Sequence, residues 1–270
     1  AVLAVRSGRR QAFAELFAPL LERFGRDSLQ RVQAALAIHM NEAQAQPTDP
    51  RQRPSFLYLP GLPTSAYFDR GLFEWIPALE ADTGAIRGEL RALLPSAAGR
   101  ERVFDNADIE GVNLRGVDRA PSWNGYYFFR HGERREENCS RCPVTAAALD
   151  RLPLSRVRDH GPEVLFSVFT PGTHLLPHRG VTNTRLVGHL PLIVPRDCAL
   201  NVGGEIHAWR EGRVVVFDDT YEHEAWNRSE EIRVVLIFDL WNPYLTEAER
   251  EALAQLIAAI GDFRMGVESA

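Results

Sequence analysis

Two histidines in the second half of the chain carry the clearest signal for chemistry. His178 stands in the triplet HRG, and His223 stands in the segment FDDTYEHEAWN. Imidazole is a good ligand for iron(II), and a β fold can bring two ligands together from distant strand ends. These histidines are therefore candidate metal ligands, and together they would make half of a metal site.

The usual third ligand of such a site is missing from its expected place. Non-haem iron sites commonly add one carboxylate to two histidines, and the position two residues after His178 is Gly180. Asp218 and Asp219 offer an alternative carboxylate, although an acid pair before a histidine more often forms a turn or orients the ring. Spacing alone leaves the site one ligand short.

An arginine begins one of the most apolar segments of the chain. Arg233 opens the run RVVLIFDL, and a buried cation without a partner is expensive. A dicarboxylic cosubstrate would satisfy it, and Ser167 could donate a further hydrogen bond. Period-two alternation also places Arg185, Val187 and His189 on one face of their strand.

Short strands must position these residues. From Trp123 onward, runs rich in β-branched and aromatic residues are separated by turn signals: WNGYYFF, VLFSVF, TRLVGHLPLI, RVVVF and IRVVLIFDL. Strands without long helices between them favour an antiparallel sandwich or barrel. We expect a mainly β fold with flanking helices, built on a double-stranded β-helix of the jelly-roll or cupin-like kind.

Helical patterns lie on both sides of this β region. Apolar spacing predicts helices across 11–40 and 75–94, joined by a proline-rich, extended surface linker over 44–60. Thr246 to Glu249 fits a capping box, which predicts a final amphipathic helix. We expect residues 1–100 to form a helical lead-in packed on the core and residues 101–270 to form the jelly-roll domain.

Composition excludes several classes of protein. The 270 residues are 45% hydrophobic and carry a net charge of −5, which argues against a nucleic-acid partner. No apolar run approaches the roughly 20 residues of a membrane span, and Ala1–Arg10 lacks the apolar centre of a signal peptide. A cytoplasmic location is expected. Three cysteines are too few for a disulfide framework, so Cys139 and Cys142 are expected to be a reduced pair.

With these motifs in view, the sequence resembles the aspartyl/asparaginyl β-hydroxylase family of iron(II)- and 2-oxoglutarate-dependent dioxygenases. The likeness covers about 123–245 and rests on FSVFTPGTHLLPHRGVTNTRLVGHLPL, WREGRVVVFDDTYEHEAWN and IRVVLIFDLWNP. Members known to hydroxylate aspartyl residues also carry glycine at the position of Gly180 and hold iron with two histidines. Gly180 thus fits the family.

The resemblance assigns roles to individual residues. It implies that His178 and His223 bind iron, that Ser167 and Arg233 bind the distal carboxylate of 2-oxoglutarate, and that His189 lies near the metal-bound end of this cosubstrate. O2 would be the other cosubstrate. The protein would orient these groups and exclude water.

The resemblance also bears on the substrate. Arg185 matches a family arginine associated with the substrate's carboxylate, and Trp123 would border the mouth of the site. Family members can have basic residues where this chain has Leu165 and Val187, so contacts to 2-oxoglutarate differ here. Some secreted members have a disulfide near Cys139, which makes a bridge the alternative to free thiols.

The implied reaction is hydroxylation of a C–H bond, with the β-carbon of an aspartyl or asparaginyl group as the leading target. The substrate would be a peptide or small molecule that carries an acidic or amide group. One alternative is an acyl-chain hydroxylase, as in the related lipid A hydroxylases. The other is a jelly-roll module that binds a metal or small acid without catalysis.

Overall fold

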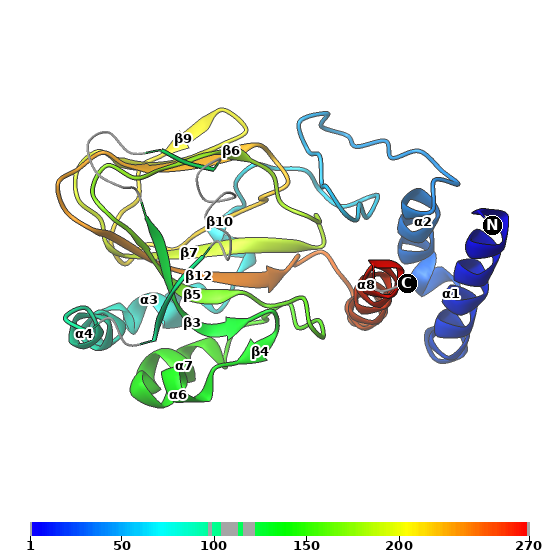
Figure 1. The fold of residues 1–270 in the computed structure, drawn as a ribbon, viewed down its shortest axis with the longest axis horizontal. Coiled ribbons are helices and arrows are strands. Elements are labelled where there is room, and N and C mark those ends of the chain that lie inside the picture. Colours follow the sequence, from blue (N-terminus) through cyan, green and yellow to red (C-terminus); the bar gives the residue numbers. More distant parts are fainter. Residues whose placement is uncertain (1, 97–98, 104–112, 116–121, 269–270) are drawn as a thin grey trace.

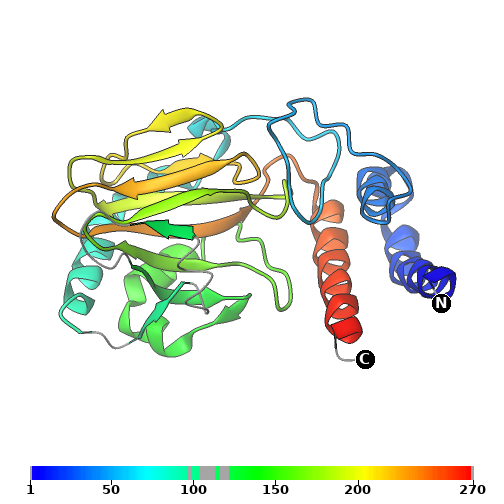
Figure 2. The same cartoon turned by 45° about the horizontal axis from the view of Figure 1, so that its top comes forward.

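The computed structural model describes residues 2–96, 99–103, 113–115 and 122–268. Within them, the strands form two stacked antiparallel sheets (Figure 1, Figure 2). The larger sheet has the order β1 (Arg100–Arg102), β3 (Trp123–Arg130), β5 (Val164–Phe169), β12 (Arg233–Trp241), β7 (Arg185–Ile193) and β10 (Val215–Phe217), with β4 (Glu133–Arg134) beside β3. The smaller sheet has the order β2 (Leu114–Arg115), β6 (His174–His178), β11 (His223–Asn227), β8 (Cys198–Val202) and β9 (Glu205–His207). The chain is mainly β with flanking helices and has a double-stranded β-helix core, as predicted.

The larger sheet has two chemically different faces because side chains alternate along a strand. Leu186, Leu190 and Leu236 belong to a buried cluster shared with the helices that cover this sheet. Val187 and Val235 belong to a second cluster, between the two sheets. The predicted alternation along β7 and β12 is confirmed, and it directs the polar residues of these strands into the space between the sheets.

Helices form two groups around the sandwich. The first group covers the outer face of the larger sheet and consists of η2 (Arg70–Leu72), α3 (Ile76–Ala81), α4 (Thr83–Leu93), α6 (Glu136–Arg141) and α7 (Pro143–Leu149). The second lies beyond one end of the sandwich and consists of α1 (Val2–Phe24), η1 (Asp27–Leu29), α2 (Gln30–His39) and α8 (Glu247–Glu268). The domain boundary near residue 100 stays a prediction. Among the described residues, no helix is both long and apolar enough to cross a bilayer.

The first predicted helix is split in two. Gly25 adopts a φ of +80° after α1, a conformation that glycine reaches without strain, and its N–H donates to the carbonyl of Leu21. The chain then turns through η1 into α2. Both helices pack with α8, whose capping box forms as predicted, since Thr246 and Glu249 exchange side-chain hydrogen bonds with each other's N–H groups.

The extended segment before the first sheet is more buried than the sequence predicts. Gln52, Leu57 and Leu59 within it are buried. The N–H of Leu59 donates to Oδ1 of Asn183 at 2.8 Å, and the side-chain amide of Asn183 donates back to the Leu59 carbonyl at 2.9 Å. The prediction that the linker runs over the surface is therefore wrong for this part of it. Hydrogen bonds to Asn183 attach it to the β core.

Candidate active site

Strands β6 and β11 bring the two candidate metal ligands together. His178 and His223 are register partners in this pairing, and their ring centroids are 4.1 Å apart. Nδ1 of His178 lies 2.8 Å from the Leu176 carbonyl, and Nδ1 of His223 lies 3.1 Å from the Tyr221 carbonyl. A carbonyl only accepts, so each Nδ1 carries the proton. Each Nε2 is thereby left with a lone pair for a ligand.

A cavity of about 720 Å³ opens beside these rings. It lies between the sheets and reaches outward to α8 and to the loop before β5. All the site residues predicted from the sequence line it: Trp123, Ser167, His178, Arg185, His189, His223 and Arg233. Burial, and then the neighbouring His178, lowers the pKa of His223 to about 3, so this ring is neutral at physiological pH. Neutral imidazole is the form that binds a metal.

Arg233 lies inside the cavity as a buried cation. Its exposed fraction is 1%, and its guanidinium carbon lies 3.7 Å from the ring centroid of Phe169 and 4.6 Å from that of Trp209. Nη1 donates to Ser167 Oγ at 3.2 Å, whereas Nε finds no hydrogen-bond partner among the described residues. Burial lowers the pKa of Arg233. The residue is thus a rigidly held cation that has no carboxylate partner in the described chain.

Trp123 and His189 complete the inner wall. Trp123 Nε1 donates to Ser167 Oγ at 2.9 Å, so this hydroxyl oxygen joins the tryptophan to Arg233. His189 is buried, and burial followed by the charge of Arg233 lowers its pKa well below the usual range. Its Nδ1 has no hydrogen-bond partner among the described residues. Several polar atoms of the inner cavity are therefore placed to bind a small anionic ligand.

Arg185 lies on another wall and already has two acidic partners. Its Nη2 lies 2.8 Å from Asp219 Oδ2, and its Nη1 forms a short contact with Asp239 Oδ2. Although burial opposes the charge, Asp219 and Asp239 raise the pKa of Arg185. The structure brings Arg185 into the cavity, but its guanidinium is neutralised by the chain's own carboxylates.

Gly180 provides space for one of these carboxylates. A Cβ added to Gly180 would lie 2.1 Å from Cγ of Asp219, and the N–H of Gly180 donates to the Asp219 carbonyl at 2.6 Å. The neighbouring Asp218 instead holds a turn, because its Oδ1 accepts from the N–H and the hydroxyl of Thr220. Within the described residues, no group of three or more His, Cys, Asp or Glu side chains is arranged to hold a metal.

Sequence reasoning missed several residues of the outer cavity. Arg130, His131 and Glu163 line it, as does Ile257 of α8. Glu163 Oε1 accepts from the N–H of His131 at 2.6 Å, and burial raises the pKa of Glu163 to about 7. These residues come from the end of β3, from loops and from a distant helix, and no local motif marks them.

Two arginines near the start of α6 pair with acidic side chains. Arg134 forms an ion pair with Asp150, and Arg135 forms one with Glu133.

Cys139 and Cys142 are free and buried, and burial raises the pKa of both thiols. Free thiols were the leading expectation for this pair, and the structure confirms it over the bridge.

Comparison with known proteins agrees with this combination of fold and paired histidines. The double-stranded β-helix with an interior histidine pair is an architecture suited to metal-dependent oxygenases. Residues 80–243 match the family described as Aspartyl/Asparaginyl beta-hydroxylase. The chain belongs to this family.

Three relatives illustrate the range of the family. The human Aspartyl/asparaginyl beta-hydroxylase is 33% identical over 186 residues, covering 68% of this chain and 23% of the relative. The Ornithine lipid ester-linked acyl 2-hydroxylase of Rhizobium tropici is 34% identical over 67% of this chain and 62% of the relative. The Aspartate beta-hydroxylase domain-containing protein 2 of Xenopus tropicalis is 34% identical over 77% and 55%. The chain thus spans less than two thirds of the length of each of these relatives.

Proposed function

We propose that this protein is an iron(II)- and 2-oxoglutarate-dependent dioxygenase in which His178 and His223 are the protein's iron ligands. One observation carries the proposal. Two histidines, each with Nδ1 at hydrogen-bond distance from a backbone carbonyl, share a cavity with Arg233, a buried cation that has no carboxylate partner among the described residues. A metal needs the free Nε2 atoms, and a dicarboxylate needs the cation.

Each inner residue has a proposed task. Arg233 and the Ser167 hydroxyl would bind the distal carboxylate of 2-oxoglutarate, and His189 would contact the end near the metal. Iron, when bound, would supply activation of O2 together with the cosubstrate. Leu165 and Val187 line the same cavity with aliphatic surface. They would exclude water around the cosubstrate instead of adding a charged contact.

The proposed target is the β-carbon of an aspartyl or asparaginyl group in a peptide or small molecule. Arg185 and Trp123 would contact the substrate. Because Asp219 and Asp239 already pair with Arg185, a substrate carboxylate would have to share this guanidinium with them. A substrate amide would contact that arginine at a lower desolvation cost than a charged carboxylate.

A second candidate is an acyl-chain hydroxylase. The outer cavity has an apolar wall that includes Val157, Val181 and Ile257, and an acyl chain would bury favourably against such a wall. The Rhizobium tropici relative has a name that describes this chemistry. A metal- or acid-binding module without catalysis is the remaining alternative.

The decisive test is succinate formation from 2-oxoglutarate. The protein is loaded anaerobically with iron(II), O2 is admitted, and succinate is measured with Asp or Asn peptides, with a hydroxyl-free acyl lipid, and without substrate. We expect turnover that a peptide stimulates and that His178→Ala or His223→Ala abolishes.

The same assay separates the alternatives. Stimulation by the acyl lipid alone would favour the second candidate. No succinate with any candidate, despite tight metal binding, would contradict the dioxygenase proposal and favour a binding module. Full activity of His223→Ala would contradict the proposed metal site.

A further inference from the structure

The segment 49–59, which we call the strap, is attached to the two loops that adjoin the paired histidines, one after His178 and one before His223. After His178, the carbonyl of Val181 accepts hydrogen bonds from the N–H groups of Phe56 and Leu57 at 2.9 and 3.0 Å. Both bonds join the strap to the loop that follows His178. The strap therefore fixes the chain on one side of the histidine pair.

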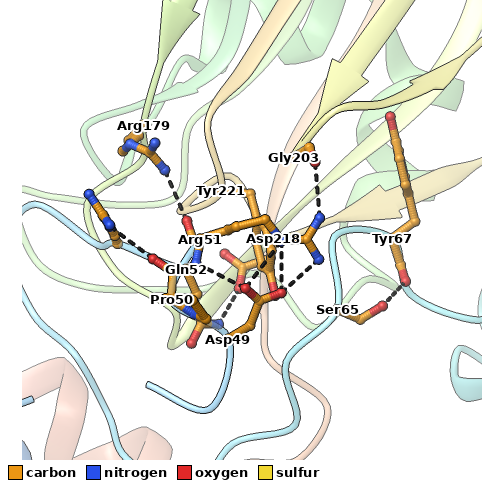
Figure 3. Close-up of polar contacts among 11 residues, drawn as sticks. Asp49, Pro50, Arg51, Gln52, Ser65, Tyr67, Arg179, Gly203, Asp218 and Tyr221 are labelled. Atoms are coloured by element: carbon orange, nitrogen blue, oxygen red, sulfur yellow. Dashed lines mark hydrogen bonds and ion pairs between the residues drawn. The ribbon is translucent and has the colours of Figure 1, made fainter. Parts of the chain in front are cut away.

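On the other side, the strap reaches the loop before His223 through Gln52. Its Nε2 donates to Asp218 Oδ2 at 2.6 Å (Figure 3), and both side chains are 1% exposed. The other carboxylate oxygen of Asp218 accepts from Thr220, which closes the turn. Gln52 Oε1 has no hydrogen-bond partner among the described residues. Burying this amide costs free energy that only one hydrogen bond offsets.

Tyr221 follows this turn directly and connects it to His223. Its side chain is fully buried, and its hydroxyl donates to Asp49 Oδ2 at 3.1 Å (Figure 3). The guanidinium carbon of Arg51 lies 5.5 Å from its ring centroid. Its carbonyl is the group that accepts from Nδ1 of His223. Strap residues thus hold Tyr221 by its hydroxyl and its ring, and Gln52 braces the turn in front of it.

We infer that Gln52 is a positioning residue of the metal site, which acts through Asp218 and the Tyr221 carbonyl to fix the tautomer and orientation of His223. The inference rests on the proposed function, in which His223 binds iron through Nε2. The hydrogen bond made by one ring nitrogen decides which nitrogen carries the proton. A displaced Tyr221 carbonyl would let the proton move to Nε2, where it competes with the metal.

The test compares Gln52→Met with the native 270-residue chain. In metal-free protein with ¹⁵N-labelled histidine, NMR correlation spectra report whether Nδ1 or Nε2 of His223 is protonated. Manganese(II) titration reports the metal Kd. We expect His223 to change from the Nδ1–H form to a mixture of tautomers, and the Kd to weaken by roughly tenfold, the lower range for loss of an outer partner of a metal ligand.

Two further variants complete the design. Gln46→Met makes the same replacement at an exposed glutamine of the preceding segment, and both readouts should keep their native values. Tyr221→Phe removes only the hydroxyl that binds Asp49, and a smaller change in the same direction is expected. This variant carries the test if Gln52→Met fails to fold by circular dichroism.

The outcomes separate the inference from the proposed function. The role of Gln52 alone would be overturned if the native protein binds metal and the folded Gln52→Met variant, or Tyr221→Phe where Gln52→Met does not fold, keeps the native His223 tautomer and Kd. A native protein that binds no metal would overturn the proposed function and, with it, the positioning role. A tautomer change together with weaker metal binding would support both.

Discussion

At the scale of single residues, Arg233 shows a conflict between stability and binding. Its guanidinium is buried between Phe169 and Trp209 with no carboxylate partner in the part of the chain that the structure describes, which costs free energy in the folded state, and burial accordingly lowers its pKa. We expect Arg233→Met to raise the Tm of the ligand-free protein by a few degrees, about 1–2 kcal/mol. The same change should weaken 2-oxoglutarate binding at least a hundredfold, as measured by calorimetry.

The stability gain is the informative half of this prediction. Arg233→Lys keeps a charge but loses the planar fork, so it should bind 2-oxoglutarate poorly without becoming more stable. If Arg233→Met lowers the Tm instead, the ligand-free guanidinium must be stabilised in the fold, and its proposed readiness for a dicarboxylate would be wrong.

Gly180 gives a second residue-scale prediction. Its Cβ would lie 2.1–2.2 Å from three atoms of the Asp219 carboxylate, which is held by Arg185 and cannot move without breaking that ion pair. Gly180→Ala should therefore lower stability by about 1–3 kcal/mol in urea unfolding. Gly84→Ala in α4 meets open space and should be neutral or slightly stabilising. Equal stabilities for native protein and Gly180→Ala would show that the Asp219 side chain has room to move.

The sequence reveals some of these residues and hides others. Arg233 could be predicted because a charge at the start of an apolar strand needs an explanation in any fold. Gln52 could not be predicted, because its partner Asp218 lies 166 positions away and an isolated glutamine in a polar linker looks solvated. The contact of Gly180 with Asp219 depends likewise on how two distant loops meet.

At the scale of elements, the strands were predictable in proportion to their burial. β5, β7 and β12 are buried over most of their length and read as long apolar runs. β6 and β11, with the sequences HLLPH and HEAWN, are short and partly polar. These two strands carry His178 and His223, the proposed iron ligands. The pairing of β6 with β11 depends on how the sheet assembles, and no local sequence pattern predicts it.

The start of α8 supports a prediction about pH. Although burial opposes the charge, hydrogen bonds from Arg31 and from the Thr246 N–H lower the pKa of Glu249. A carboxylate with a lowered pKa stabilises the fold above its unfolded pKa near 4.3, and this contribution is lost as the pH falls through the folded value. Glu249→Gln should cost about 1–3 kcal/mol at pH 7. The difference from the native protein should shrink below about pH 4.

Another ion pair of the same helix provides the matched control. Glu251 pairs with Arg23 of α1, and the two side chains are 34% and 60% exposed, whereas the side chain of Glu249 is 4% exposed. Glu251→Gln should change the free energy of unfolding by less than about 1 kcal/mol at either pH, because water and salt screen exposed pairs. Urea unfolding at both pH values measures the two variants. Equal losses would mean that burial does not set the strength of these pairs.

At the scale of the whole molecule, the two helix groups have different relations to the β core. α3 and α4 contribute Ile76 and Leu90 to the cluster that covers the larger sheet. The helices α1 and α2 pack chiefly with α8 and the strap, in a separate cluster. A boundary at residue 100 would therefore expose the part of the sheet's outer face that α3 and α4 cover, whereas a boundary before the strap would expose mainly one face of α8.

This difference predicts unequal results for two N-terminal deletions. Deletion of residues 1–43 keeps the strap, α3 and α4, so the β core should still unfold cooperatively and bind manganese(II), with lower stability from the uncovered α8. Deletion of residues 1–100 removes η2, α3 and α4 and leaves α6 and α7 over the outer face of the larger sheet. It therefore uncovers part of an apolar cluster whose burial is a main source of the core's stability. That fragment should lose near-UV circular dichroism and cooperative unfolding. Cooperative unfolding of residues 101–270 alone would instead show that the strap and the helices before residue 100 are dispensable additions to an independent domain.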